Sequence, residues 1–341
     1  MINPAPLAHT RLSTGESVGR LARCGDFVIN GQTGMQSQLN GLAGKCQALA
    51  IAPFHWYHHA ALRLAYDASH FAHDPLHMTR TPLILITNDD GIASKGLRSA
   101  AEACDPLGEV LICAPTVQQS GAGRSMPPTS EGRIFPRDFT INGRTIAGYA
   151  VEGTPAQVVQ HGLFEIAERA VDLVVSGINY GENLGEGVTV SGTVGAALES
   201  ASLKVPSIAI SLETSKEHHY SLSDEIDFSV AAYFLRFFAR RVLERGLPPQ
   251  TGILKIEIPS TATPQTDWRW TRLSQVRYFV PVKPLRRRPA DPGPIGYEAI
   301  TSFDHVERDS DVWAVRVDRV VAVTPLTTDF TAPIDLAALS R

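Results

Sequence analysis

The sequence lacks the features that mark several specialised classes of protein. No apolar run approaches the roughly 20 residues needed to span a bilayer. The four cysteines, Cys24, Cys46, Cys104 and Cys113, show no CxxC spacing, and the last two fall in an expected helix and strand, where a buried reduced thiol is the usual state. Charged residues make up only 19% of the chain, and the formal net charge is -4. We therefore expect a globular protein of a reducing compartment, the cytoplasm, with neither a membrane nor a nucleic-acid polymer as partner.

Residues 1–79 do not share the pattern of the rest of the chain. Glycine, serine and glutamine follow one another irregularly, without alternation of strands and helices. We predict a poorly structured extension here, either a leader or the product of a start-site error, with Met78 as the natural first residue. His55, His58 and His59 have helical spacing that suits a metal, but no carboxylate motif accompanies them, so we favour an incidental cluster.

From Thr81 onward, strands and helices alternate. The expected buried strands are residues 83–87, 110–114, 173–175, 207–212 and 252–258. The expected helices are residues 96–104, 155–169, 194–203 and 223–244. This alternation predicts an α/β fold over residues 80–260, with a Rossmann-like, doubly wound, mainly parallel sheet and right-handed crossovers.

Two further segments favour antiparallel structure. Residues 133–149 read as a hairpin, because Asn142-Gly143 is a favoured two-residue turn. In residues 261–341 we expect a β-rich extension that packs on the core or on a second subunit. Its expected parts are a β-ribbon over residues 268–281, a loop rich in proline and arginine over residues 283–296, and a strand over residues 312–323.

Two adjacent acids, Asp89 and Asp90, follow the first apolar run directly, and a glycine turn follows them. A buried strand would deliver both at its carboxyl end, which is the edge where open α/β sheets bind ligands. Two neighbouring carboxylates repel, so a bound cation is a natural way to keep both ionised. The alternative is that one acid caps the next helix while the other faces solvent.

Oxygen-bearing side chains also follow the next two core strands. Ser120 lies in the loop after the second strand, and Asn179 follows the third. In a parallel sheet these segments converge on one edge with Asp89 and Asp90. Two carboxylates, a hydroxyl and an amide carbonyl favour Mg²⁺, Mn²⁺ or Ca²⁺ over zinc, and so few protein ligands leave positions open for water and substrate. That arrangement favours catalysis over a structural role.

Ser191-Gly192-Thr193 stands directly before the helix expected over residues 194–203. Unpaired backbone N–H groups and the helix dipole make such a helix start a good phosphate site, and glycine lets the backbone approach closely. Ordinary N-capping by Ser191 or Thr193 is the alternative. Beside a metal site at the same sheet edge, phosphate binding becomes the preferred interpretation.

Several motifs together resemble the SurE family of survival-protein nucleotidases. They cover about residues 82–332 in the expected order, and the combination is far more specific than any one of them. The motifs are Asn88-Asp89-Asp90-Gly91, Ala114-Pro115 with Ser120-Gly121, Gly153-Thr154-Pro155, Ser176-Gly177-Ile178-Asn179 with Gly181 and Asn183-Leu184-Gly185, Ser191-Gly192-Thr193, Asp311-Val312-Trp313-Ala314-Val315, and Val323-Thr324-Pro325-Leu326.

The resemblance implies a metal-dependent phosphatase of nucleoside 5′- and 3′-monophosphates, and some family members also trim polyphosphate ends. It implies one divalent ion per subunit, Mg²⁺ or Mn²⁺ above others, and a homodimer or homotetramer. The implied metal ligands are Asp89, Asp90, Ser120 and Asn179, and the implied phosphate-binding residues are Asn183, Ser191, Gly192 and Thr193. The sequence departs from the family pattern at Tyr180, Glu182, Val190 and Ala156-Gln157, which bears on base preference more than on chemistry.

For the reaction itself we expect Asp89 or Asp90, with a slight preference for Asp90, to accept the proton of an attacking water. An aspartyl-phosphate mechanism is disfavoured, because the second acid it needs two positions later is replaced by Gly91. A dinucleotide-dependent oxidoreductase would need GxGxxG, and residues 88–96 supply only Gly91 and Gly96. A non-catalytic nucleotide or metal sensor on the same fold stays open.

Overall fold

The computed structural model describes residues 80–221 and 223–334. All of them belong to one of the two compact units into which the chain divides, the one that covers Ala65–Arg341. The predictions for residues 1–79, including Met78 as the natural start and the three histidines, lie outside the described residues.

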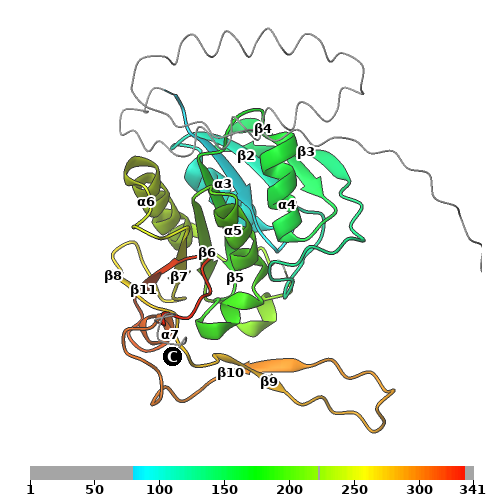
Figure 1. Cartoon of the computed structure of the whole chain (residues 1–341), viewed down its shortest axis with the longest axis vertical. Coiled ribbons are helices and arrows are strands. Elements are labelled where there is room, and N and C mark those ends of the chain that lie inside the picture. The colour runs from blue at the N-terminus through cyan, green and yellow to red at the C-terminus, as the bar shows by residue number, and fades with distance from the viewer. Residues whose placement is uncertain (1–79, 222, 335–341) are drawn as a thin grey trace, which may run out of the picture. The chain divides into compact units, whose positions relative to one another are not determined.

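The core of the described part is a mixed, mainly parallel sheet of nine strands (Figure 1). In sheet order the strands are β3 (Ile134–Ile141), β4 (Arg144–Val151), β2 (Glu109–Pro115), β1 (Leu83–Thr87), β5 (Leu173–Tyr180), β6 (Ser207–Leu212), β7 (Ile253–Ile258), β11 (Val321–Leu326) and β8 (Trp268–Trp270). Only the pairs β3–β4 and β7–β11 are antiparallel among these. The predicted fold class is confirmed.

Helices cover both faces of this sheet, which explains why its central strands are continuous apolar runs. Every residue of β1, β6 and β7 is buried. Ile84 and Ile86 pack with α3 (Lys95–Cys104) and α6 (Ser229–Arg245). Leu83 and Leu85 point to the opposite face, with α4 (Pro155–His161) and α5 (Gly192–Ser202). Alternate residues of one strand therefore serve two layers of helices.

Local capping sets where the helices begin. Ser94 Oγ accepts a hydrogen bond from Leu97 N and starts α3. Thr154 and Gln157 form a reciprocal capping box at α4, with Pro155 in the first turn. The helix then continues as a π-helical segment, η2 (Gly162–Ile166), so it ends before the predicted residue 169.

The long helix α6 begins at Ser229 rather than at residue 223 as predicted. The residues before it contact α3 instead: Lys95 Nζ donates to the carbonyl oxygens of Asp224 and Ile226 at 2.6 and 2.7 Å. These contacts hold both carbonyl groups towards Lys95 of α3, and the helix starts only after them. No helix of residues 80–221 or 223–334 has the length and hydropathy to cross a membrane.

The strand predicted over residues 312–323 is wrong. The structure has a short helix there, α7 (Asp311–Arg316), followed by β11. Ser310 caps α7 by accepting a hydrogen bond from Trp313 N at 3.2 Å, and Val312, Ala314 and Val315 are buried. A short apolar segment fits both the helical and the strand period, so the hydrophobic pattern alone assigned the wrong element.

The β-ribbon predicted over residues 268–281 is two separate elements. β8 joins the main sheet beside β11, whereas β9 (Phe279–Val282) pairs with β10 (Gly296–Ala299) in a two-stranded antiparallel sheet. The hairpin at Asn142-Gly143 is as predicted, and both turn residues have positive φ, 46° and 78°. Two short 3₁₀ helices, η3 (Gly185–Thr189) and η4 (Lys216–His218), follow β5 and β6.

We expect Gly96→Ala to destabilise the fold, because a Cβ at this position of α3 would lie 2.0 Å from the carbonyl oxygen of Ile178 in β5. Forcing the helix off the sheet should cost up to about 3 kcal/mol in the free energy of unfolding. Urea unfolding measures it, with the exposed Arg98→Ala in the same helix as control. Equal unfolding midpoints for the two variants would contradict this account of the α3–β5 contact.

Candidate active site

A cavity of about 840 Å³ opens at the carboxyl edge of the sheet, where the segments after β1, β2, β5 and β6 meet. Of the eight residues predicted for the site, five line it: Asp89, Ser120, Asn179, Asn183 and Ser191. The other three, Asp90, Gly192 and Thr193, are neighbours of these in the chain. The structure therefore brings the whole predicted set to one edge.

Asp89 is held against the start of α5. Its side chain is almost fully buried, and its Oδ1 accepts a hydrogen bond from Thr193 Oγ1 at 2.5 Å. A Cβ on Gly192 would lie 2.7 Å from Asp89 Oδ2, so only glycine permits this approach. The end of β1 and the N-terminus of α5 are thus joined through one carboxylate.

Asp90 faces the other neighbouring loops. Gln118 Nε2 donates to Asp90 Oδ1 at 3.1 Å and to the carbonyl oxygen of His219 at 2.8 Å. The backbone N–H of Tyr180 donates to Asp90 Oδ2 at 3.4 Å. Asp90 is therefore tied to the loops after β2 and β6, and to the residue beside Asn179.

No cationic side chain in the described part of the protein balances the charges of the two carboxylates. Burial raises the pKa of Asp89, against the opposing effect of the Thr193 hydrogen bond. Burial raises the pKa of Asp90 well above its ordinary value, and the charge of Asp89 raises it further. Within residues 80–221 and 223–334, neither acid forms an ion pair with a cationic side chain. A bound cation is what this pair of acids needs to remain ionised together.

The two neutral candidate ligands, Asn179 and Ser120, both line the cavity. Asn179 Nδ2 donates to the carbonyl oxygens of Gly181 at 2.6 Å and Tyr180 at 3.3 Å, which leaves its Oδ1 as a free acceptor. Ser120 lies exposed in the loop after β2. The described residues contain no group of three or more His, Cys, Asp and Glu that could hold a metal. An ion here would depend on amide and hydroxyl oxygens beside the two acids, a donor set that fits a hard divalent cation.

The phosphate candidates lie around the start of α5 and the loop after β5. Ser191 Oγ accepts a hydrogen bond from Val194 N at 3.2 Å, so this residue performs the capping role that was the alternative interpretation. An accepting hydroxyl keeps its own proton to donate, so capping and anion binding are compatible. Asn183 lines the cavity, and its Nδ2 donates to Ser211 Oγ on β6 at 3.0 Å. The arrangement can place a cation and an anion side by side.

The positions that depart from the family pattern have identifiable contacts. Tyr180, Glu182 and Val190 all line the cavity. Glu182 Oε1 accepts a hydrogen bond from the hydroxyl of Tyr278 at 2.7 Å, and burial raises the pKa of Glu182. Gln157 completes the capping box of α4. The first three of these departures therefore shape the wall of the site.

Other residues of the site were not anticipated from sequence. Gln118 and His219 follow β2 and β6, so the rule that places ligands after parallel strands could have found them. Tyr297 and Phe279 come from the β9–β10 hairpin, and no sequence signal places them here. His219 Nδ1 lies 2.9 Å from the hydroxyl of Tyr297, and their rings stack with centroids 6.2 Å apart.

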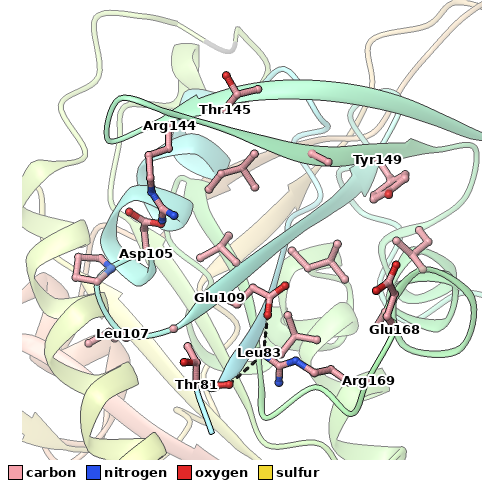
Figure 2. A pocket seen from close by; sticks show the side chains of 18 residues that line it. Thr81, Leu83, Asp105, Leu107, Glu109, Arg144, Thr145, Tyr149, Glu168 and Arg169 are labelled. Carbon is pink, nitrogen blue, oxygen red and sulfur yellow. Dashed lines mark hydrogen bonds and ion pairs between the residues drawn. The ribbon is translucent and has the colours of Figure 1, made fainter.

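A second cavity, of about 870 Å³, lies at the opposite end of the strands, beside the start of β2 and β4 (Figure 2). Each of its two arginines already has an acidic partner. Arg144 pairs with Asp105, and Arg169 Nη2 lies 2.7 Å from Glu109 Oε2. With these charges balanced locally, this cavity offers less to an anionic ligand than the carboxyl edge does.

The fold and the site define a doubly wound α/β protein with a candidate cation and phosphate site at the carboxyl edge of its sheet. The family model for survival protein SurE matches residues 84–279. The chain therefore belongs to the SurE family.

Individual relatives agree with this assignment. A protein of Thermococcus kodakarensis named 5′-nucleotidase SurE is 42% identical over 260 residues, which cover 76% of this chain and 97% of that protein. A protein of the same name from Archaeoglobus fulgidus is 40% identical over 255 residues, 74% of this chain and 94% of the relative. The crystal structure of the SurE protein from Aquifex aeolicus matches with a TM-score of 0.62 and 32% identity, over 76% of this chain and 98% of that one.

We expect Thr193→Val to weaken binding of Mn²⁺ about tenfold, because the variant keeps the packing volume and removes a hydrogen bond that orients Asp89, a candidate metal ligand. Isothermal titration with Mn²⁺ measures the affinity. Thr140→Val, on the exposed face of β3, is the matched control. Wild-type affinity in the Thr193 variant would show that Asp89 does not depend on this contact to bind a cation.

Proposed function

We propose that this chain is a divalent-metal-dependent phosphomonoesterase that hydrolyses nucleoside 5′-monophosphates to nucleoside and phosphate. The observation that carries the proposal is the contact between Asp89 and Thr193. It joins the first of two buried acids, neither of which has a cationic partner among the described residues, to the start of α5. A cation site and an anion site then share one wall of the cavity. The relatives named 5′-nucleotidase SurE support the same activity.

The proposal extends to nucleoside 3′-monophosphates and to the ends of polyphosphate. We place the enzyme in the cytoplasm, where the buried, free thiols of Cys104 and Cys113 would stay reduced. We assign residues 80–260 to the catalytic core and residues 261–341 to an extension that joins subunits in a homodimer or homotetramer.

Asp89, Asp90, Ser120 and Asn179 would hold one Mg²⁺ or Mn²⁺ per subunit. The buried acids without a cationic partner and the free Oδ1 of Asn179 fit that role. When bound, the ion would supply Lewis-acid stabilisation of the charge on the transferring phosphoryl group.

The chain's own groups account for the remaining steps. Asn183 and the hydroxyl of Ser191 would hold phosphate oxygens, and Gly192 and Thr193 would contribute through the first turn of α5, since the Thr193 hydroxyl already donates its proton to Asp89. Asp89 borders the cavity and is placed to accept a proton from water there. Asp90 is not among the lining residues, and both of its oxygens accept hydrogen bonds. Because Asp89 also accepts a hydrogen bond, from Thr193, only its place at the cavity favours it over Asp90 as the base, against the slight sequence-based preference.

The test is phosphate release from a panel of nucleoside monophosphates, with Mn²⁺ and after removal of metal by EDTA. We expect wild-type turnover to stop on chelation and to return with Mn²⁺. Asp89→Asn should lose activity about 1,000-fold or more, because the ion's several kcal/mol of charge stabilisation depends on this ligand.

The control for Asp89→Asn is Asp138→Asn, an exposed acid of β3, which should keep wild-type activity. Circular dichroism and urea unfolding verify that both variants fold. Full metal-dependent activity in Asp89→Asn would refute the assignment. Nucleotide and metal binding by the wild type without any turnover would identify a sensor instead.

A further inference from the structure

Three charged side chains lie fully buried behind the loop that follows β5. Lys255 and Glu257 project from β7, and Asp311 is the first residue of α7, each with 0% exposure. We refer to these three residues as the Lys255 cluster. Burying ions costs several kcal/mol each unless every charge is paired and hydrogen-bonded, so such a cluster needs a reason beyond packing.

The cluster binds the main chain of a proposed phosphate-binding residue. Lys255 Nζ lies 3.1 Å from Glu257 Oε1, 3.1 Å from Asp311 Oδ2 and 2.7 Å from the carbonyl oxygen of Asn183. These contacts use all three donors of the ammonium group. Glu257 Oε2 accepts a hydrogen bond from Asn183 N at 2.9 Å. The backbone N–H and C=O of Asn183 are therefore both hydrogen-bonded to the cluster.

The same cluster holds the segments on either side of the site. Asp311 Oδ2 accepts from Gly185 N at 3.0 Å, where η3 begins, and Asp311 Oδ1 accepts from Ser274 N at 2.9 Å. Burial alone would lower the pKa of Lys255, but Glu257 and Asp311 outweigh it and raise that pKa. The ammonium group thus stays charged as the centre of the cluster.

The side chain of Asn183 extends to the strand next to β7. Its Nδ2 donates to Ser211 Oγ on β6 at 3.0 Å, and Asn183 itself lines the cavity. With the N–H and the carbonyl of Asn183 both fixed from β7, the peptide groups on either side of its Cα cannot rotate freely. The direction of its side chain is set accordingly.

We propose that Lys255, Glu257 and Asp311 are positioning residues, which fix the backbone of Asn183 so that its amide meets the substrate's phosphate. The inference rests on the proposed function, because it takes Asn183 as a phosphate ligand. It gives the segment after residue 260 a part in assembling the site, through Asp311.

The first test compares Glu257→Leu with Glu257→Gln. The leucine removes the acceptor of Asn183 N–H and leaves Lys255 paired with Asp311, so no unbalanced charge is created. The glutamine keeps an oxygen in the same place. We expect the KM for a nucleoside 5′-monophosphate and the Kd for inorganic phosphate in the presence of Mn²⁺ to rise about tenfold in Glu257→Leu. Both should stay near wild type in Glu257→Gln, and Mn²⁺ affinity should be unchanged in both.

Ile256→Ala is the matched control, because Ile256 lies on the same strand with its side chain on the opposite face, in the main core. It should lower stability without changing phosphate affinity. If Glu257→Leu does not fold, Lys255→Met/Glu257→Gln serves instead. That double variant keeps the net charge of the cluster, removes the donor to Asn183 O, and should give the same tenfold loss.

Phosphate binding is measured by calorimetry and needs no turnover, so it separates the two proposals. A wild type that binds phosphate without hydrolysing nucleotides would refute the function and leave the positioning role to be decided by the variants. Wild-type KM and phosphate affinity in folded Glu257→Leu, or in the double variant, with only a lower unfolding midpoint, would overturn the inference and make the cluster purely structural.

Discussion

The repulsion between Asp89 and Asp90 is the constraint around which this edge of the sheet is arranged. β1 delivers both acids into a buried environment, where neither has a cationic partner among the described residues. Their hydrogen bonds come from three directions, namely Thr193 on α5, Gln118 after β2 and the backbone of Tyr180. Each of these hydrogen bonds holds one neighbouring element. The bonds that stabilise the two buried carboxylates therefore also position the wall of the cavity.

The Lys255 cluster differs from the Asp89–Asp90 pair because it contains its own cation. In the Lys255 cluster a cation is already built into the protein, and its polar contacts end on the main chain of the loop after β5. At the cavity, the two carboxylates have no cationic partner among the described residues, whereas behind it Lys255 is paired with two acids. The loop after β5 is therefore held rigidly on the side of the Lys255 cluster, while the two aspartates on the cavity side can accept a cation.

Local rules predicted much of this arrangement. The apolar run of β1 and the alternation of elements were enough to bring Asp89, Asn179 and Ser191 to one edge, because parallel strands share an orientation. Sequence could not reveal the Lys255 cluster, since its third member, Asp311, lies 54 positions after Glu257. It also misassigned α7, where the cap made by Ser310 outweighs an apolar pattern that suits either period.

The place of β11 in the sheet has a consequence for the order in which the protein can assemble. β11 is inserted between β7 and β8, and β8 meets the sheet only through it. During synthesis, Trp268–Trp270 therefore leaves the ribosome some fifty residues before its neighbour exists. Until Val321–Leu326 emerges, β7 presents an open edge, and the nascent domain carries an unpaired strand that a chaperone or a second chain could meet first.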